Sequence, residues 1–162
     1  MMAAAAMMGL AACGNDAGKV QTTTDPVQAN PAPVVENSPQ GVLPGSDLEF
    51  SQVVGDTVLF ATDAYDLASE AQSTLQRQAA WLLQYPARTA VIQGHADERG
   101  TREYNLALGE RRANSVRAYL VALGVDAMRL QTVSFGKEQP LCGEASEACW
   151  QGNRRATTAL NP

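Results

Sequence analysis

Hydrophobic residues are unevenly spaced along this chain, and their spacing divides it into two parts. From residue 14 to about residue 55 no helical or strand period is present, and five prolines are spread through the segment. Proline fixes φ and removes a backbone donor, and a segment with few apolar residues gains too little from burial to fold. We therefore predict a disordered tether over residues 13–55, of which only residues 48–51 lie close enough to the next part to pack against it.

In the remainder of the chain, residues 56–162, strand and helix patterns alternate. Short apolar runs indicate strands at Val58–Phe60 and Thr89–Gly94, and an alternating pattern indicates another at Leu130–Phe135. A last strand is expected at Arg154–Leu160, after a short helical turn. This part therefore predicts one folded domain.

Two helices are predicted between these strands. An apolar stripe at helical spacing runs over residues 71–83, and Ser69 with Gln72 has the form of a capping box at its start. A second, longer stripe runs over residues 104–123 and ends at Gly124. The order β-α-β-α-β-β predicts an α/β (α+β) fold in which the helices cover one face of a small mixed sheet.

The N-terminus has the pattern of a processing signal. Residues 1–12 are apolar and small, and the segment ends in Leu10-Ala11-Ala12-Cys13. Such a run is shorter than the roughly 20 residues that span a bilayer, but it is typical of a secretory signal. The ending resembles a bacterial lipobox, in which the cysteine becomes the lipidated first residue of the mature chain. No basic residue precedes Lys19, so we expect the natural start to lie upstream; an ordinary apolar N-terminus is the alternative.

The other cysteines fit an exported protein. If Cys13 carries lipid, Cys142 and Cys149 remain as an even pair, which favours a disulfide in an oxidising compartment. Closing so short a loop would stabilise the fold by about 2–3 kcal/mol. A zinc site would need further ligands, and the one histidine, His95, is distant in sequence, so no metal site is expected.

Charged residues gather where the second predicted strand passes through a loop into the second predicted helix. Asn105, Leu108 and Arg112 are spaced at i, i+3 and i+7 and therefore share one face of that helix, and Asp97 lies in the loop before it. A carboxylate accepts from an ammonium group, and a guanidinium offers a carboxylate two parallel donors. Asp97 and Arg112 together suit a free amino-acid head. The alternative is that Asp97 caps the next turn and Arg112 is a solvated helix residue.

Other chemistries are disfavoured by the same residues. The net charge of −5 argues against a nucleic-acid partner. Asp97 and Glu98 are adjacent and usually would point apart, whereas glycoside cleavage needs two carboxyl groups facing one bond. No serine lies in a nucleophile elbow. His95 is expected to form a hydrogen bond within its loop.

The charged stretch resembles the peptidoglycan-associated lipoproteins, a branch of the OmpA-like domain family. The resemblance covers about residues 56–160, and its motifs occur in the family's order behind the lipobox and the proline-rich segment. The matching motifs are GHADERGT at residues 94–101, EYN at 103–105, ALGERRA at 107–113, SFGKEQP at 134–140 and NRRA at 153–156.

The resemblance implies a pocket for the diaminopimelate side chain of the peptidoglycan stem peptide. Its key pair falls on Asp97 and Arg112, with Asn105 as a polar contact and Asp63 as an acidic position after the first strand; Leu108 shares the same helix face. We expect Asp97 and Arg112 to be partly exposed and free of core packing. The family segment Phe-Asp-Phe-Asp is Phe-Ala-Thr-Asp at residues 60–63 here, so one acidic group of the rim is absent.

The resemblance also implies a function without catalysis and without a cofactor. A lipid on Cys13 would hold the chain in the outer membrane, with the domain in the periplasm gripping the cell wall. Residues 14 and 15 are Gly and Asn rather than an Asp after the cysteine, which permits this sorting in similar lipoproteins. The family acts in the Tol–Pal system, where TolB competes for the same face, in envelope integrity and cell division. A lipoprotein cell-wall hydrolase is the alternative.

Overall fold

The computed structural model describes residues 41–161. The expected signal segment, the lipidation site Cys13 and most of the expected tether lie outside the described residues.

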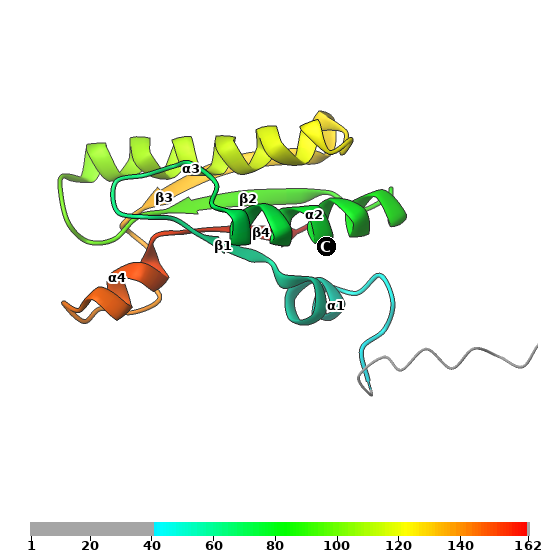
Figure 1. The fold of residues 1–162 in the computed structure, drawn as a ribbon, viewed down its shortest axis with the longest axis horizontal. Helices are drawn as coiled ribbons and strands as arrows, with labels where there is room; N and C mark the ends of the chain where they lie inside the picture. The colour runs from blue at the N-terminus through cyan, green and yellow to red at the C-terminus, as the bar shows by residue number, and fades with distance from the viewer. Residues whose placement is uncertain (1–40, 162) are drawn as a thin grey trace, which may run out of the picture. The chain divides into compact units, whose positions relative to one another are not determined.

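A four-stranded mixed sheet forms the centre of the domain (Figure 1). Its strands are β1 (Thr57–Leu59), β2 (Ala90–His95), β3 (Leu130–Gly136) and β4 (Arg155–Leu160), in the order β1-β4-β2-β3. Strand β4 is antiparallel to β1 and β2, whereas β2 and β3 are parallel. The four strands predicted from the sequence are confirmed within a residue or two at their ends.

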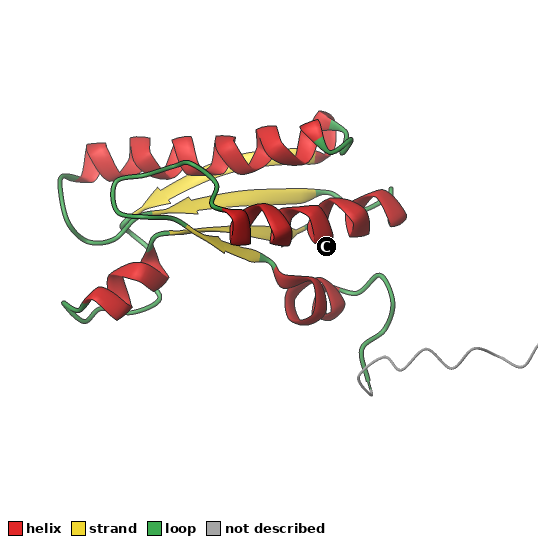
Figure 2. Cartoon of the chain, viewed as in Figure 1, coloured by secondary structure: helices red, strands yellow, loops and turns green. Residues whose placement is uncertain are grey.

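Two long helices cover one face of this sheet (Figure 2), as the sequence predicts. They are α2 (Ser69–Gln84) and α3 (Arg102–Ala122). Shorter helical segments are α1 (Asp47–Glu49), the π-helical turn η1 (Phe50–Gly55), the 3-10 turn η2 (Ala127–Arg129) and α4 (Glu147–Asn153). Within residues 41–161, no helix has both the length and the apolar character needed to cross a membrane.

The core lies between the helices and the sheet. Leu75 and Leu82 of α2, Ile92 of β2, and Val116 and Leu120 of α3 are fully buried there. Their spacing follows the helical and strand periods that predict these elements. The fold class expected from the sequence is therefore confirmed.

Paired glycines let α3 approach β2 very closely. A Cβ atom on Gly94 would lie 1.8 Å from the carbonyl oxygen of Gly109, and one on Gly109 would lie 2.4 Å from Ser134 Oγ. Neither position has room for a side chain. Because Arg112 follows Gly109 by three residues on α3, this close approach also brings Arg112 to the end of the sheet.

The ends of the two long helices differ in how well the sequence predicts them. The capping box at Ser69 and Gln72 is wrong, because Ser69 is already helical and no side chain caps α2. Gln72 Nε2 donates instead to the carbonyl oxygen of Leu67 at 2.9 Å. At the end of α3, Gly124 adopts φ +99° and its N–H donates to Val121 O at 2.9 Å. This is the glycine stop that the sequence predicts.

The folded part begins before residue 56. Phe50 is 1% exposed, and its ring lies 4.9 Å from that of Trp81. Trp81 Nε1 donates to Glu49 Oε2, and Gln78 Nε2 donates to Gly55 O, both at 2.7 Å. The contact expected for residues 48–51 is confirmed, but the boundary at 55 is too late. Val54, four residues after Phe50, is buried as well, but two apolar residues one turn apart are too short a pattern to predict a helical element.

A disulfide joins Cys142 and Cys149, as expected. It closes the loop that leads into α4, where Ser146 Oγ caps the helix by accepting from Cys149 N at 3.3 Å. The side chain of Asn153 donates to Cys142 O at 2.8 Å and accepts from Leu141 N at 2.8 Å. Loop and helix therefore form one tied unit next to the end of the sheet.

Candidate ligand-binding site

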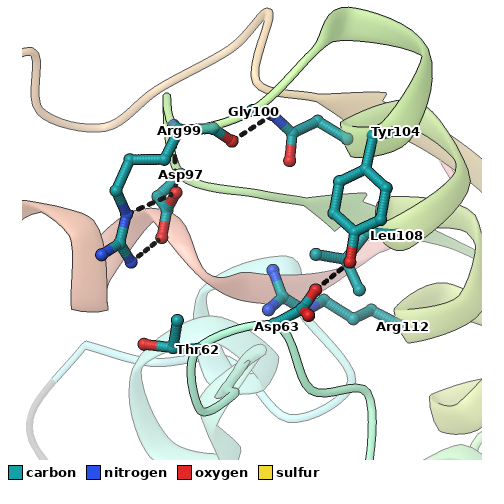
Figure 3. A pocket seen from close by; sticks show the side chains of 9 residues that line it. Thr62, Asp63, Asp97, Arg99, Gly100, Tyr104, Leu108 and Arg112 are labelled. Atoms are coloured by element: carbon teal, nitrogen blue, oxygen red, sulfur yellow. Dashed lines mark hydrogen bonds and ion pairs between the residues drawn. The ribbon is translucent and has the colours of Figure 1, made fainter.

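A cavity of about 320 Å³ lies where the loop after β1 meets the loop between β2 and α3 (Figure 3). All five residues that the sequence assigns to a binding site line it. Four further residues complete the wall. The lining consists of Thr62, Asp63, Asp97, Arg99, Gly100, Tyr104, Asn105, Leu108 and Arg112.

The loop between β2 and α3 is fixed at both ends. Thr101 Oγ1 caps α3 by accepting from Tyr104 N at 3.2 Å. One turn into the helix, Asn105 Nδ2 donates to the carbonyl oxygen of Arg99 at 2.8 Å. Asn105 is 2% exposed, and its amide holds the loop in place. Leu108 and Arg112 lie on the same face of α3 as Asn105, as predicted from their spacing.

Asp97 is held by two arginines. Its Oδ1 accepts from Arg99 N and Nε, both at 3.1 Å, and its Oδ2 accepts from Arg99 Nη2 at 2.6 Å. Arg154 Nη1 adds a longer contact of 3.4 Å. Burial by itself would raise the pKa of Asp97, but the hydrogen bonds and charge of Arg99, with the contact to Arg154, outweigh it and hold the pKa below its ordinary value. The carboxylate is therefore ionised at neutral pH.

Arg112 is fully buried, at 0% exposure. Its Nε donates to Ala64 O at 2.8 Å, Nη1 to His95 O at 2.8 Å, and Nη2 to Ala61 O at 3.1 Å. Burial lowers its pKa to about 10, although the charges of Asp97 and Asp63 partly oppose this. The guanidinium is thus still charged at neutral pH.

The expectation that Asp97 and Arg112 are partly exposed and free of core packing is wrong. Asp97 is 7% exposed and Arg112 is wholly enclosed. Arg112 donates three of its five N–H groups to backbone carbonyls, and two of these carbonyls, those of Ala61 and Ala64, belong to the loop after β1, which folds over it. Since Ala61 contributes its carbonyl oxygen, the missing acidic side chain at that position leaves this contact intact.

The rim of the cavity beside α3 is acidic and aromatic. The hydroxyl of Tyr104 donates to Asp63 Oδ1, and this hydrogen bond raises the pKa of Tyr104. Asp63 adopts φ +56°, an uncommon conformation for a non-glycine residue. The guanidinium of Arg111 lies over the rings of Tyr65 and Tyr104, at 5.4 and 6.0 Å from their centroids. Asp63 is thereby fixed at the mouth of the cavity.

Sequence reasoning missed two arginines and one tyrosine at this site. Arg99 and Tyr104 lie within the motifs already identified, so their sequence position was a usable signal. Arg154 belongs to the motif at residues 153–156 and reaches Asp97 only through the fold. No local pattern connects two residues so far apart in the chain.

His95 does not form the hydrogen bond that is expected of it from the sequence. It ends β2, is 2% exposed, and its ring stacks on Phe135 with centroids 5.4 Å apart. Neither ring nitrogen has a well-formed hydrogen bond, so the expected bond within the loop is absent. Burial, together with the charge of Arg155 and partly opposed by the backbone of Gln139, lowers the pKa of His95 to about 4. The imidazole is neutral at physiological pH.

The chemistry of the cavity favours binding over catalysis. Two carboxylates, Asp63 and Asp97, and two guanidiniums, Arg99 and Arg112, line it. The lining is therefore balanced in charge and suits a small ligand that carries both signs. A glycosidase acid needs a raised pKa, whereas that of Asp97 is lowered. Over residues 41–161, no three His, Cys, Asp or Glu side chains are grouped so that they could hold a metal ion.

Comparison with known proteins places this fold and site in a defined class. The model of the OmpA family matches residues 59–154. The chain is 44% identical to a peptidoglycan-associated lipoprotein of Mesorhizobium japonicum, over 99% of this chain and 90% of that one. It is 52% identical to one from Agrobacterium fabrum, over 72% and 66% of the two chains. A crystal structure of the peptidoglycan-associated lipoprotein from Burkholderia pseudomallei matches with TM-score 0.67 and 41% identity, over 72% and 100%.

The chain therefore belongs to the OmpA family and, within it, to the peptidoglycan-associated lipoproteins. The relatives are named for association with peptidoglycan and not for a reaction, which agrees with a binding domain that is not an enzyme.

Proposed function

We propose that this domain binds peptidoglycan non-covalently by holding the diaminopimelate of the stem peptide in the cavity. The free end of that side chain carries one ammonium and one carboxylate. The observation that supports this ligand is that Asp97 and Arg112 both line one small cavity, in a chain that belongs to the peptidoglycan-associated lipoproteins. The ammonium would lie on Asp97, and the carboxylate would take the free N–H groups of Arg112.

The size and charge of the cavity support the same ligand. A volume of about 320 Å³ matches the lower end of small-molecule sites, which suits a single amino-acid head. The balanced charges of the lining, two carboxylates and two guanidiniums, suit the free end of diaminopimelate, which carries one ammonium and one carboxylate. Leu108 would contact the methylene groups, Asp63 would offer the ammonium a second acceptor, and Asn105 would hold the loop.

We further propose the cellular role that follows from membership of this family. Residues 1–12 would be removed as a signal, and Cys13 would carry the acyl chains that anchor the protein in the outer membrane. Residues 14–40 would then span from the membrane to a domain in the periplasm. Anchor and domain joined by a tether make a bivalent link, so modest affinity for the wall is enough. TolB and the other Tol proteins would be its protein partners, in envelope integrity and cell division.

Co-sedimentation with purified peptidoglycan tests the proposed ligand. Asp97→Asn keeps the shape of the side chain but removes its charge, so it should lose wall binding. Glu110→Gln removes one negative charge from the exposed side of α3 and should bind like the wild type. Wild-type sedimentation of Asp97→Asn would overturn the assignment. Soluble fragments released from the wall by the wild type would favour the hydrolase alternative.

A further inference from the structure

Asp97 has no acceptor position left for a ligand. A carboxylate offers about four acceptor sites on its two oxygens. Arg99 N and Nε occupy those of Oδ1, and Arg99 Nη2 with Arg154 Nη1 occupies those of Oδ2. An incoming ammonium therefore reaches Asp97 only if one of these donors leaves.

Arg99 is the donor that is free to leave. The Arg154 side chain is 3% exposed, and its other N–H groups donate to Phe60 O, Glu147 Oε1 and Gln151 Oε1. The Arg99 side chain is 41% exposed, and within the described residues its guanidinium hydrogen-bonds only to Asp97. Figure 3 shows it reaching Asp97 from the side away from Tyr104. Moving Arg99 thus breaks one pair, whereas moving Arg154 breaks the packing of α4.

A surface next to Asp97 holds the guanidinium of Arg99. It lies over the ring of Trp150, 4.4 Å from the centroid. Trp150 Nε1 donates to Glu98 Oε1 at 3.0 Å, which fixes the ring beside a second carboxylate. Trp150 belongs to α4 and directly follows Cys149 of the disulfide. The aromatic face therefore helps to hold Arg99 in its position on Asp97.

We propose that Arg99 is a displaceable internal cation that occupies the ammonium position on Asp97, and that a ligand binds by exchanging its own ammonium for this guanidinium. The inference rests on the proposed function and adds a specificity-determining residue to it. A ligand that displaced the Arg99 side chain without bringing a cation would leave the enclosed carboxylate of Asp97 with only Arg99 N and the 3.4 Å contact to Arg154, which is costly. Arg99 therefore selects for ligands with a free amino group.

Calorimetric titration with the soluble tripeptide L-Ala-D-Glu-meso-diaminopimelate tests the exchange. Arg99→Ala removes the competitor and should bind the tripeptide about threefold to tenfold more tightly, as expected for a half-exposed pair. Arg102→Ala is the matched control, because it removes the same charge from an exposed arginine that pairs with Glu138 and does not touch Asp97. Its affinity should equal that of the wild type.

Two further measurements separate exchange from a general change in charge. The gain of Arg99→Ala should disappear for a tripeptide acetylated on its side-chain amino group. Trp150→Leu should tighten binding by less than Arg99→Ala and should add nothing in the Arg99→Ala background, because both act on one contact. An Arg99→Ala variant that binds no more tightly than Arg102→Ala overturns the exchange while the wall-binding proposal stands. Failure of the wild type to bind either the tripeptide or the wall overturns both.

Discussion

The two charged residues at the centre of the cavity are held in opposite ways. Asp97 pairs through its side chain with other side chains, and its main partner, Arg99, is half-exposed. Arg112 is enclosed and donates to the backbone of the loop after β1 and to that of His95 at the end of β2. The comparison teaches that Asp97 has a partner that a ligand can exchange, whereas Arg112 is part of the folded framework. Substitutions on the two sides should therefore separate binding from stability.

Arg112→Ala should give the largest effect. It leaves three carbonyl groups without their donor in a closed space, so we expect the free energy of unfolding to fall by roughly 3–5 kcal/mol. Arg112→Lys should recover little, because an ammonium lacks the planar fork that reaches three carbonyls. Urea unfolding measures both variants. A near-wild-type midpoint for Arg112→Ala would show that the enclosed side is not structural.

The pH dependence of stability tests the Arg112 side of the cavity as well, because the carbonyl of His95 accepts from Arg112. The folded protein binds a proton on His95 with a pKa of about 4, whereas the unfolded chain does so near 6.5. Between these values the unfolded state binds more protons, so stability falls as the pH is lowered from 6.5 to 4. The loss should reach about 3 kcal/mol over this window.

His95→Gln provides the control, because the chain has no other histidine. Urea unfolding at pH 7 and pH 4.5 should show a strong pH dependence for the wild type and a weaker one for the variant. Asp97 stays ionised in this window because its pKa lies below its ordinary value. Equal pH dependence in both proteins would mean that His95 is not the group that titrates.

Removing the disulfide should lower the free energy of unfolding by an intermediate amount, and it acts on the Asp97 side of the cavity. Cys142→Ser with Cys149→Ser opens the loop before α4, the helix that carries Trp150 and leads to Arg154, and should lower the free energy of unfolding by about 2–3 kcal/mol. Unfolding of the wild type with and without dithiothreitol should show the same difference. Reductant should leave the double variant unchanged, and if it does not, the shift has another source.

Asp97→Asn should give the smallest change in stability. Its main partner is half-exposed, and the amide retains a hydrogen bond, so we expect a loss of about 1 kcal/mol, well below that of Arg112→Ala. Thermal unfolding measures it beside wall co-sedimentation of the same sample. A loss as large as that of Arg112→Ala would remove the distinction between the two sides of the cavity.

Short-range patterns in the sequence predicted most of the fold and several of the residues that line the site. The strand periods, the long helices, the stop at Gly124 and the cysteine pair are short-range features that one stretch of sequence contains by itself. The spacing of Asn105, Leu108 and Arg112 placed them on one helix face for the same reason. The side-chain cap of α2 was predicted wrongly although its start was right to within one residue, because Ser and Gln at capping spacing do not require that they form the cap.

The sequence alone therefore determined the four strands and the two long helices, the family of the chain and five of the nine residues that line the cavity. Only the tertiary structure decided the state of those side chains. The burial of Phe50, the enclosure of Arg112 by the loop after β1, and the contact between Asp97 and Arg154 each join residues that are distant in the chain. Periodicity is a property of neighbours along the chain, whereas burial and charge pairing are properties of neighbours in space. Arg99 lies only two residues from Asp97, but the direction of a side chain in a loop has no period, so this pair was recognised only in the folded molecule.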